Sequence, residues 1–268
     1  MTASPEARRM VRLEVREQVA TLTLDCPEKR NAFDLVLRDQ LAEAVRTVRR
    51  DRDIRAVVLT GAGGHFCAGG DLRNIGSLQI DSGQWRERLG NVHEWLRDLL
   101  TLDRPVVAAV DGAAAGAGFS LALAADFVIA TPRAWFCMSF IKVGLVPDVG
   151  AFHTLPRVVG VQRARELMLS GRDVRADEAL RLGIVSELHA PEALLPRAWA
   201  IARSFTGASP TAVGLIKRAL AEGAPSLAQA LDAEANAQAV AAGTPAHREA
   251  VAAFLDKRPL PFSWPPAA

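Results

Sequence analysis

Two glycine-rich turns are the parts of this sequence whose residue types and spacing could do chemistry. The apolar run 57–59 leads into five glycines within the ten positions 61–70, and the apolar run 106–110 leads into the small-residue turn 111–118. Such runs are typical of strands buried on both faces, and glycine lets backbone N–H groups approach a ligand closely. The second turn precedes an Ala/Leu-rich helix, whose N-terminus carries unpaired N–H groups and partial positive charge. The pattern predicts a backbone site for an oxygen anion or a phosphate, although the first stretch alone is equally consistent with a glycine turn that has no function.

The first turn lacks the two common phosphate-binding motifs. No Gly-Lys-Ser/Thr follows it, which excludes a P-loop, and the GxGxxG spacing of a dinucleotide-binding fold is also absent. The first turn is therefore neither of these two nucleotide-binding motifs.

Strands and helices alternate in the first part of the chain, and helices dominate from about residue 160. A hairpin is expected at 11–15 and 19–24, and Asp34 is expected to cap a helix with apolar positions at helical spacing. The further expected strands are 56–60, 106–110, 126–130, 134–139 and 184–188. The further expected helices are 117–125, 161–169, 176–182, 191–204, 210–221, 226–241 and 245–255.

The composition predicts a large buried core and argues against nucleic acid as the main partner. Half of the 268 residues are hydrophobic and the formal net charge is +2. Cys26, Cys67 and Cys137 have neither metal-site nor disulfide-framework spacing, so a reducing compartment and no bound metal are expected. The polar segment 1–12 lacks the apolar centre of a signal peptide, and no apolar stretch approaches a membrane span. We expect a cytoplasmic protein without a membrane partner.

The two glycine turns carry a resemblance to a known family. Phe-Cys-Ala-Gly-Gly-Asp-Leu at 66–72, together with Asp-Gly-Ala-Ala-Ala-Gly-Ala-Gly at 111–118, resembles the crotonase (enoyl-CoA hydratase/isomerase) family, and the likeness extends to residues 254–259. It implies an α/β fold, a spiral of ββα units over 1–195, with a C-terminal helical region over 196–268 that mediates trimers or hexamers and closes over coenzyme A. It also implies an acyl-CoA thioester as substrate, with no further cofactor. Periodicity alone leaves a doubly wound sheet open.

The resemblance places the family's oxyanion hole on the backbone N–H groups of Gly70 and Ala117. Both donors would aim at the thioester oxygen as it becomes an enolate oxygen, and each such donor is worth on the order of 3 kcal/mol. The family usually has glycine at the second position. Alanine keeps the N–H, so function should survive unless the turn needs a positive φ there.

The acidic residues decide which reaction is expected. The positions of the two hydratase glutamates hold Ser120 and Phe140, which leaves neither the usual base nor the usual acid for adding water. Asp148 falls in the segment where the family's isomerases keep a single carboxylate, and Leu145, Val146 and Val149 would desolvate it and raise its pKa. One carboxylate can move a 3,4 double bond to the 2,3 position by taking a C2 proton and returning it at C4. Asp148 as a turn residue or a cap is the alternative.

The remaining implied contacts concern coenzyme A. The resemblance puts Arg30 near its phosphates and the backbones of Ala32 and Ala68 along adenine and pantetheine. It puts Phe254 and Lys257 over coenzyme A from the C-terminal helix, either of the same chain or of a neighbouring subunit. Asp71 and Leu72 extend the first turn, and the resemblance implies that both contact the substrate, although Asp71 is also a candidate helix cap. It likewise implies that Ser120 and Phe140 contact the acyl group.

Three hypotheses follow. The first is an enoyl-CoA isomerase that uses Asp148. The second is another reaction on the same oxyanion hole, such as hydration, decarboxylation or hydrolysis. The third is a non-catalytic acyl-CoA binder, suggested by the missing glutamates and the alanine at 117.

Overall fold

Two sheets carry the fold of the computed structural model, which describes residues 8–223 and 226–266. Positions 1–7 of the polar N-terminal segment lie outside the described residues. The main sheet has the order β1-β2-β3-β4-β6-β9 and the smaller sheet the order β5-β7-β8. The main sheet consists of β1 (Val11–Arg16), β2 (Val19–Leu24), β3 (Ala56–Gly61), β4 (Val106–Val110), β6 (Phe127–Ala130) and β9 (Glu187–Leu188); the smaller one of β5 (Ala113–Ala115), β7 (Trp135–Cys137) and β8 (Asp173–Arg175).

The chain moves back and forth between the two sheets. β4 belongs to the main sheet and β5 to the smaller one, after which α4 (Ala117–Leu123) leads back to β6, and β7 again lies in the smaller sheet. A parallel bridge between Cys67 and Ala114 continues the smaller sheet toward the first glycine turn. This alternation is the predicted spiral of ββα units and not a doubly wound sheet.

Parallel pairing brings the two glycine turns together. β3 and β4 pair in parallel, with Thr60 opposite Ala109. Because the carboxyl ends of parallel neighbours lie at the same edge of a sheet, the turns that leave β3 and β4 emerge side by side.

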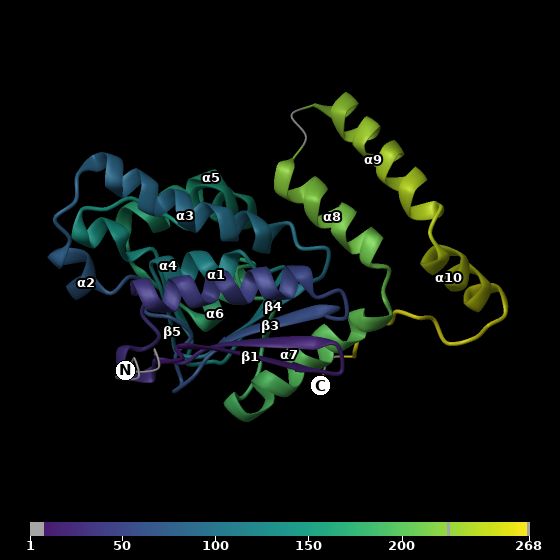
Figure 1. Ribbon diagram of the computed structural model, residues 1–268, viewed down its shortest axis with the longest axis horizontal. Helices are drawn as coiled ribbons and strands as arrows, with labels where there is room; N and C mark the ends of the chain where they lie inside the picture. The colour runs from purple at the N-terminus through teal and green to yellow at the C-terminus, as the bar shows by residue number, and fades with distance from the viewer. Residues whose placement is uncertain (1–7, 224–225, 267–268) are drawn as a thin grey trace, which may run out of the picture.

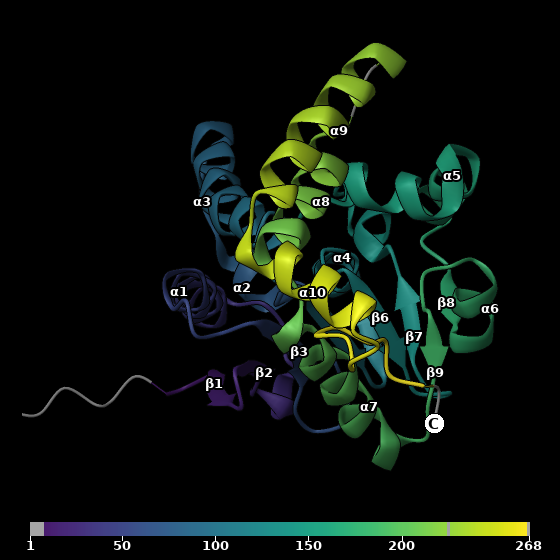
Figure 2. The same cartoon turned by 90° about the vertical axis from the view of Figure 1, so that its right-hand side faces the viewer.

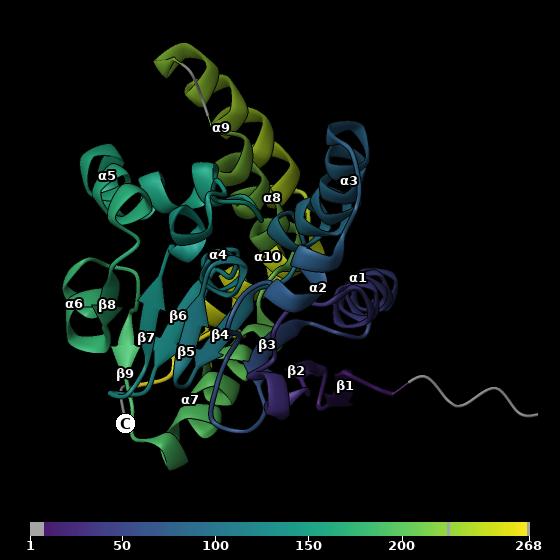
Figure 3. The ribbon, with the colours of Figure 1, turned by 90° about the vertical axis from the view of Figure 1, so that its left-hand side faces the viewer.

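Helices cover both faces of the main sheet (Figure 1). α1 (Leu35–Arg50), α3 (Ser82–Leu100) and α4 lie on one side, and α7 (Pro191–Ser204) lies on the other. Figure 3 shows α1, α2 (Leu72–Ser77) and α3 near one another at the edge of this layer. The Asp34 carboxylate accepts a hydrogen bond from the Leu37 N–H at 2.9 Å, which confirms the predicted cap of α1.

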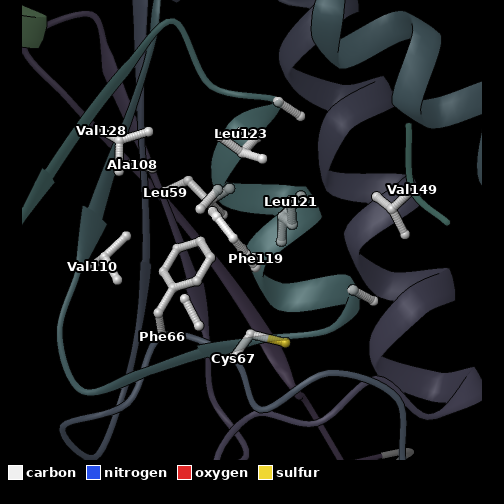
Figure 4. Packing of buried hydrophobic residues seen from close by; sticks show 14 of the residues in the cluster. Leu59, Phe66, Cys67, Ala108, Val110, Phe119, Leu121, Leu123, Val128 and Val149 are labelled. Carbon is white, nitrogen blue, oxygen red and sulfur yellow. The ribbon is translucent and has the colours of Figure 1, made fainter. Parts of the chain in front are cut away.

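The core lies between the strands and α4 (Figure 4). Phe66 and Phe119 are fully buried there, and the Phe119 and Phe136 rings lie 5.2 Å apart. Each buried aromatic side chain removes a large apolar area from water, so the two glycine turns rest on a well-packed base.

The second half of the chain is mostly helical, as predicted. It contains α5 (Ala151–Ser170), α6 (Ala176–Arg181), α8 (Pro210–Glu222), α9 (Leu227–Ala242) and α10 (Pro245–Leu255). Short 3₁₀ turns lie at η1 (Pro27–Lys29), η2 (Ser139–Val143) and η3 (Phe205–Gly207). α8, α9 and α10 project from the body of the molecule (Figures 1 and 2).

Three details differ from the sequence-based expectations. The helix α3 was not expected, and α5 begins at Ala151 instead of 161, with a break where Gly160 adopts φ 76°. The predicted domain boundary at 195 falls inside α7, whose Leu194 and Ile201 pack on the main sheet. The projecting helical part therefore begins after α7.

The chain returns to the body after α10. The Trp264 ring packs 5.2 Å from Phe127 of β6, and the Arg197 guanidinium donates to the Pro266 carbonyl at 2.6 Å. Within the described ranges, no helix combines the length and the apolar character needed to cross a membrane.

Candidate functional site

A cavity of about 270 Å³ lies between the glycine turns, η2 and α3. Its backbone wall consists of Ala68, Gly70, Gly116 and Ala117. Its side-chain wall is formed by residues of α3, namely Trp85, Arg88, Leu89, Val92 and Trp95. The segment that contains Asp148 completes the lining, so the structure brings together the three residues to which the sequence assigned chemistry.

The Gly70 N–H faces the cavity because its neighbours are tied to Phe33. The Phe33 N–H donates to the Gly69 carbonyl at 2.7 Å, and the Asp71 N–H donates to the Phe33 carbonyl at 2.9 Å. Backbone groups of successive residues in an extended segment point to opposite sides, so the Gly70 N–H points away from Phe33. It has no acceptor in the described parts of the chain.

The Ala117 N–H is an unpaired donor at the start of α4. The Gly116 N–H donates to the Cys137 carbonyl at 2.8 Å, and the Gly116 carbonyl accepts from the Ser120 N–H at 3.1 Å. The Ala117 N–H itself finds no acceptor among residues 8–223 and 226–266, as the first groups of a helix do not. The positive φ of this turn falls on Gly116, at 50°, and not on Ala117, so alanine fits without strain.

Close packing fixes the distance between the two turns. A β-carbon on Gly69 would lie 2.7 Å from the Ala115 carbonyl oxygen and 3.6 Å from the Ala117 nitrogen, and one on Gly118 would lie 2.2 Å from the Cys67 carbonyl oxygen. Glycine is required at both positions for the turns to approach one another. Two unpaired N–H groups on adjoining turns can together bind one oxygen anion.

The Asp148 side chain is half-buried on the cavity wall and has one unsatisfied oxygen. Its Oδ1 atom is buried and accepts no hydrogen bond from the described residues. Burial raises the pKa of Asp148 to about 6, while the positive charge of Arg88 acts in the opposite direction. A carboxyl group with this pKa can both take and return a proton near neutral pH.

The local backbone holds Asp148 in place. Val149, the next residue, adopts φ 48°, which is unfavourable for a β-branched side chain, and its side chain is 5% exposed. Such strain is maintained only where the surrounding structure enforces it, and it is common at functional sites. Of the three apolar residues expected to desolvate Asp148, Val149 is buried, whereas Leu145 and Val146 are exposed at 37% and 69%.

Sequence reasoning missed the side-chain wall. α3 was not expected, although Trp85, Arg88, Val92 and Trp95 recur at intervals of three and four residues, which is a helical signal. A capping box of Asp81 and Gln84 also marks the start of this helix.

Ser120 and Phe140 occupy different environments. Ser120 is fully buried, and its hydroxyl donates to the Gly116 carbonyl at 3.3 Å. It is not among the residues that line the cavity, so the structure does not bring this predicted acyl contact to the cavity. Phe140 does line the cavity and is 8% exposed.

Some residues of the first turn line the cavity, and another caps a helix instead. Ala68 and Leu72 line the cavity. Asp71 caps α2 by accepting from the Arg73 N–H at 3.0 Å and forms an ion pair with Lys29 at 3.1 Å, and this pair lowers the Asp71 pKa. The helix-cap interpretation of Asp71 is therefore confirmed.

Apart from Ala68, the predicted coenzyme A contacts lie outside this cavity. Arg30 is exposed, and its carbonyl accepts from the Ala68 N–H at 2.9 Å, while Ala32 is buried next to it. Phe254, at 71% exposed, lies in α10, and Lys257 follows the end of that helix; neither lines the cavity within this chain.

Asn31 is a positioning residue that sequence reasoning did not identify. Its side chain is fully buried, donates to the His65 carbonyl at 2.7 Å and accepts from the Cys26 N–H at 2.8 Å. It thereby ties the loop after β2 to the first glycine turn. The only feature of the sequence that could have identified Asn31 was its place as an amide side chain in a loop of charged residues.

Metal-ligating side chains do not gather at this cavity. No three His, Cys, Asp or Glu residues come close enough to hold a metal ion in the parts of the chain that the structure describes.

Comparisons with known proteins identify the protein family of this chain. The profile of the enoyl-CoA hydratase/isomerase family matches residues 14–264. The chain is 41% identical to 1,2-epoxyphenylacetyl-CoA isomerase of Escherichia coli, over 93% of this chain and 96% of that protein. It is 32% identical to short-chain-enoyl-CoA hydratase of Clostridium acetobutylicum, over 92% and 95% of the two chains.

A solved structure agrees. The crystal structure of an enoyl-CoA hydratase/isomerase from Cupriavidus metallidurans superimposes with a TM-score of 0.92 at 44% identity, over 98% of this chain and 100% of that one. The chain belongs to the enoyl-CoA hydratase/isomerase family and has its crotonase-like fold. The relatives include both an isomerase and a hydratase, so the reaction must be argued from the cavity.

Proposed function

We propose that this protein is an acyl-CoA isomerase that moves a double bond from the 3,4 to the 2,3 position of an enoyl thioester. One observation carries the proposal: Asp148 is the one carboxylate on the lining of a cavity, within the described residues, that also presents the unpaired N–H groups of Gly70 and Ala117. A single carboxylate and an anion site are the parts that this reaction requires.

The reaction runs in two proton transfers. The thioester carbonyl oxygen accepts hydrogen bonds from the N–H groups of Gly70 and Ala117, and the Asp148 carboxylate removes a proton from C2. The electron pair of the broken C–H bond delocalises through the carbonyl and the 3,4 double bond as a dienolate, whose oxygen the two donors stabilise. The Asp148 carboxylic acid then returns its proton to C4. No atom is gained or lost.

The environment of Asp148 suits both halves of this cycle. A pKa of about 6 leaves the group largely ionised at neutral pH yet basic enough to hold the proton between the two steps. Asp148 also lines the cavity, which brings its carboxyl group next to a bound acyl group.

Hydration is less well supported. Adding water requires one group to activate the water and another to deliver a proton to the neighbouring carbon. Phe140 has no proton to exchange, and the Ser120 hydroxyl is buried away from the cavity. The non-catalytic binder is disfavoured because a carboxylate with a buried, unsatisfied oxygen is costly to retain without a role.

A second candidate reaction is the one named for the relative from Escherichia coli, the isomerisation of 1,2-epoxyphenylacetyl-CoA. The aromatic rings of Phe33, Trp85, Trp95 and Phe140 on the cavity lining favour an aromatic acyl group. This reaction would bind the thioester oxygen at the same two N–H groups, those of Gly70 and Ala117.

The handling of coenzyme A forms part of the proposal. Arg30 and the backbones of Ala32 and Ala68 hold its nucleotide and pantetheine, and Phe254 and Lys257 close over it from α10 of a neighbouring copy in a trimer or a dimer of trimers. The exposure of Phe254 in the single chain supports an origin in a second copy. Coenzyme A enters as part of the substrate, and no further cofactor is required.

The test is turnover of hex-3-enoyl-CoA, followed by absorbance of the conjugated thioester and by product mass. We expect 2-enoyl-CoA of unchanged mass, and a fall in kcat of about 10²–10⁴-fold in Asp148→Asn, the usual contribution of a general base. Asp53→Asn, at an exposed position away from the cavity, is the matched control. A product heavier by one water, or normal turnover in Asp148→Asn, would overturn the proposal; turnover of only the epoxide substrate would favour the second candidate.

A further inference from the structure

The cavity carries more positive charge than its catalytic chemistry needs. Arg38 of α1 and Arg88 of α3 both line it, together with the exposed Lys142, against the single carboxylate of Asp148. Asp148 must exchange a proton with substrate, so it cannot serve as a permanent counter-ion for two guanidinium groups.

Arg38 is partly buried and lacks a close anionic partner. Its side chain is 13% exposed, and its nearest carboxylate, that of Asp39, is 3.8 Å away and 75% exposed. A buried cation normally pairs with an anion at hydrogen-bond distance, because its desolvation is otherwise uncompensated. No hydrogen bond from the Arg38 guanidinium to the described residues offsets this.

Arg88 also lacks a close anionic partner. Its guanidinium lies 5.9 Å from the centre of the Trp85 ring and forms no ion pair within 4 Å among the described residues. Burial and the positive charge of Arg38 lower the Arg88 pKa, while the carboxylates of Asp148 and Asp39 act in the opposite direction, and both arginines line the same cavity. Such a pair is stabilised when an anion enters between them.

A third donor on the same side-chain wall lacks an acceptor. The Trp95 side chain is 3% exposed, and its Nε1 atom is buried with no hydrogen-bond partner in the described chain. Trp95 lies seven residues after Arg88, on the same face of α3. Two guanidinium groups and an indole N–H therefore point to a ligand that is rich in oxygen acceptors and negatively charged.

We propose that the acyl group of the natural substrate carries a carboxylate, which Arg38 and Arg88 bind, so that the enzyme prefers the mono-CoA thioester of an unsaturated dicarboxylic acid. This inference rests on the proposed isomerase function and adds its substrate class. Guanidinium groups match the planar, bidentate geometry of a carboxylate. The thioester end is held by Gly70 and Ala117, the proton moves on Asp148, and the arginines select the other end of the acyl chain.

The test compares two substrates that differ only in the charge of one end. They are the mono-CoA thioester of hex-3-enedioic acid and its methyl ester, both isomerised by the same C2-to-C4 proton shift. We expect the wild-type kcat/KM for the acid to exceed that for the ester by about 10–100-fold, the range of a charge-assisted hydrogen bond. Arg88→Met and Arg38→Met should lose most of this preference while still turning over the ester, and Arg88→Lys should retain part of it.

The matched control is Arg86→Met, an exposed arginine two residues before Arg88 on the same helix, which should keep the preference. Equal kcat/KM for acid and ester in the wild type, or equal losses on both substrates in Arg88→Met, would overturn the inference.

Binding of saturated analogues separates this inference from the proposed reaction. Adipoyl-CoA and its methyl ester cannot isomerise, so calorimetry reports recognition alone. Tighter binding of adipoyl-CoA that is lost in Arg88→Met would support the carboxylate site even if no isomerase activity were found. Equal binding of the two analogues would reject the site even if hex-3-enoyl-CoA were turned over.

Discussion

The backbone wall and the side-chain wall of the cavity are built by different physical means. The backbone wall consists of two turns that are locked by hydrogen bonds between Phe33, Gly69 and Asp71 and by contacts too close for a β-carbon. The side-chain wall is one face of α3, whose Trp85 and Arg88 are only half-buried. A site made of backbone atoms depends on the fold and tolerates few substitutions, whereas a site made of side chains can change without disturbing the fold. The first wall suits a chemical step shared across a family, and the second suits substrate choice.

The largest expected effect tests the rigidity of the backbone wall. Gly118→Ala would place a β-carbon 2.2 Å from the Cys67 carbonyl oxygen, in a fully buried region. We expect the free energy of unfolding to fall by about 3 kcal/mol or more, at or beyond the upper end of the usual cost of overpacking. Urea unfolding measures it. Gly90→Ala on α3, where nothing lies within 4 Å, is the control and should raise stability by about 0.5–1 kcal/mol; equal stability of the two variants would refute the comparison.

Removing one donor from the backbone wall tests its chemical role. Ala117→Pro deletes the N–H at the first position of α4, where proline is compatible with the helix. We expect kcat to fall by about 10²–10³-fold, as for loss of one oxyanion donor, with little change in melting temperature. Unchanged kcat in a folded variant would remove Ala117 from the proposed mechanism.

The pH dependence links the two walls through Asp148. The proposed base acts when ionised, so kcat/KM should rise with pH through about 6 and then level off. Arg88 lowers the Asp148 pKa, so Arg88→Met should move this midpoint to higher pH, measured with a neutral 3-enoyl-CoA. A midpoint that stays in place would show that Arg88 does not act on Asp148.

The same ionisation affects stability. The Asp148 pKa is raised above 3.8 by burial in the folded state, so the folded state binds more protons than the unfolded chain between pH 3.8 and about 6. Stability from this group therefore decreases as pH rises through that window. Asp148→Asn should lack this decrease in unfolding experiments at pH 4 to 7.

The smallest expected effect concerns Ser120. Its hydroxyl bonds to the Gly116 carbonyl and does not reach the cavity. Ser120→Ala should leave kcat close to the wild-type value and cost about 1 kcal/mol of stability, the net worth of one hydrogen bond. A large loss of kcat would instead indicate that the hydroxyl takes part in the reaction.

Much of the site was predictable because it is local in sequence. Apolar runs followed by glycines predicted the strands β3 and β4 and the turns that present Gly70 and Ala117, and the helical spacing after Asp34 predicted α1. The helix α3 was missed because its glycines and charged residues weaken the local signal, and its position is decided by packing against α1. The attachment of α7 to the main sheet could not be seen in the sequence, because it depends on contacts with distant strands.

The sequence by itself determined the two glycine turns, the single carboxylate of Asp148 and the family to which the chain belongs. Only the tertiary structure decided that Asp148 shares a cavity with Gly70 and Ala117 and that Ser120 is withdrawn from it. It also decided that Arg38 and Arg88, from two helices, line that cavity with no carboxylate of the described residues at hydrogen-bond distance. The reason is physical: a strand or turn is specified by residues within a few positions of one another, whereas burial, charge balance and an unsatisfied oxygen are properties of segments that the fold brings together.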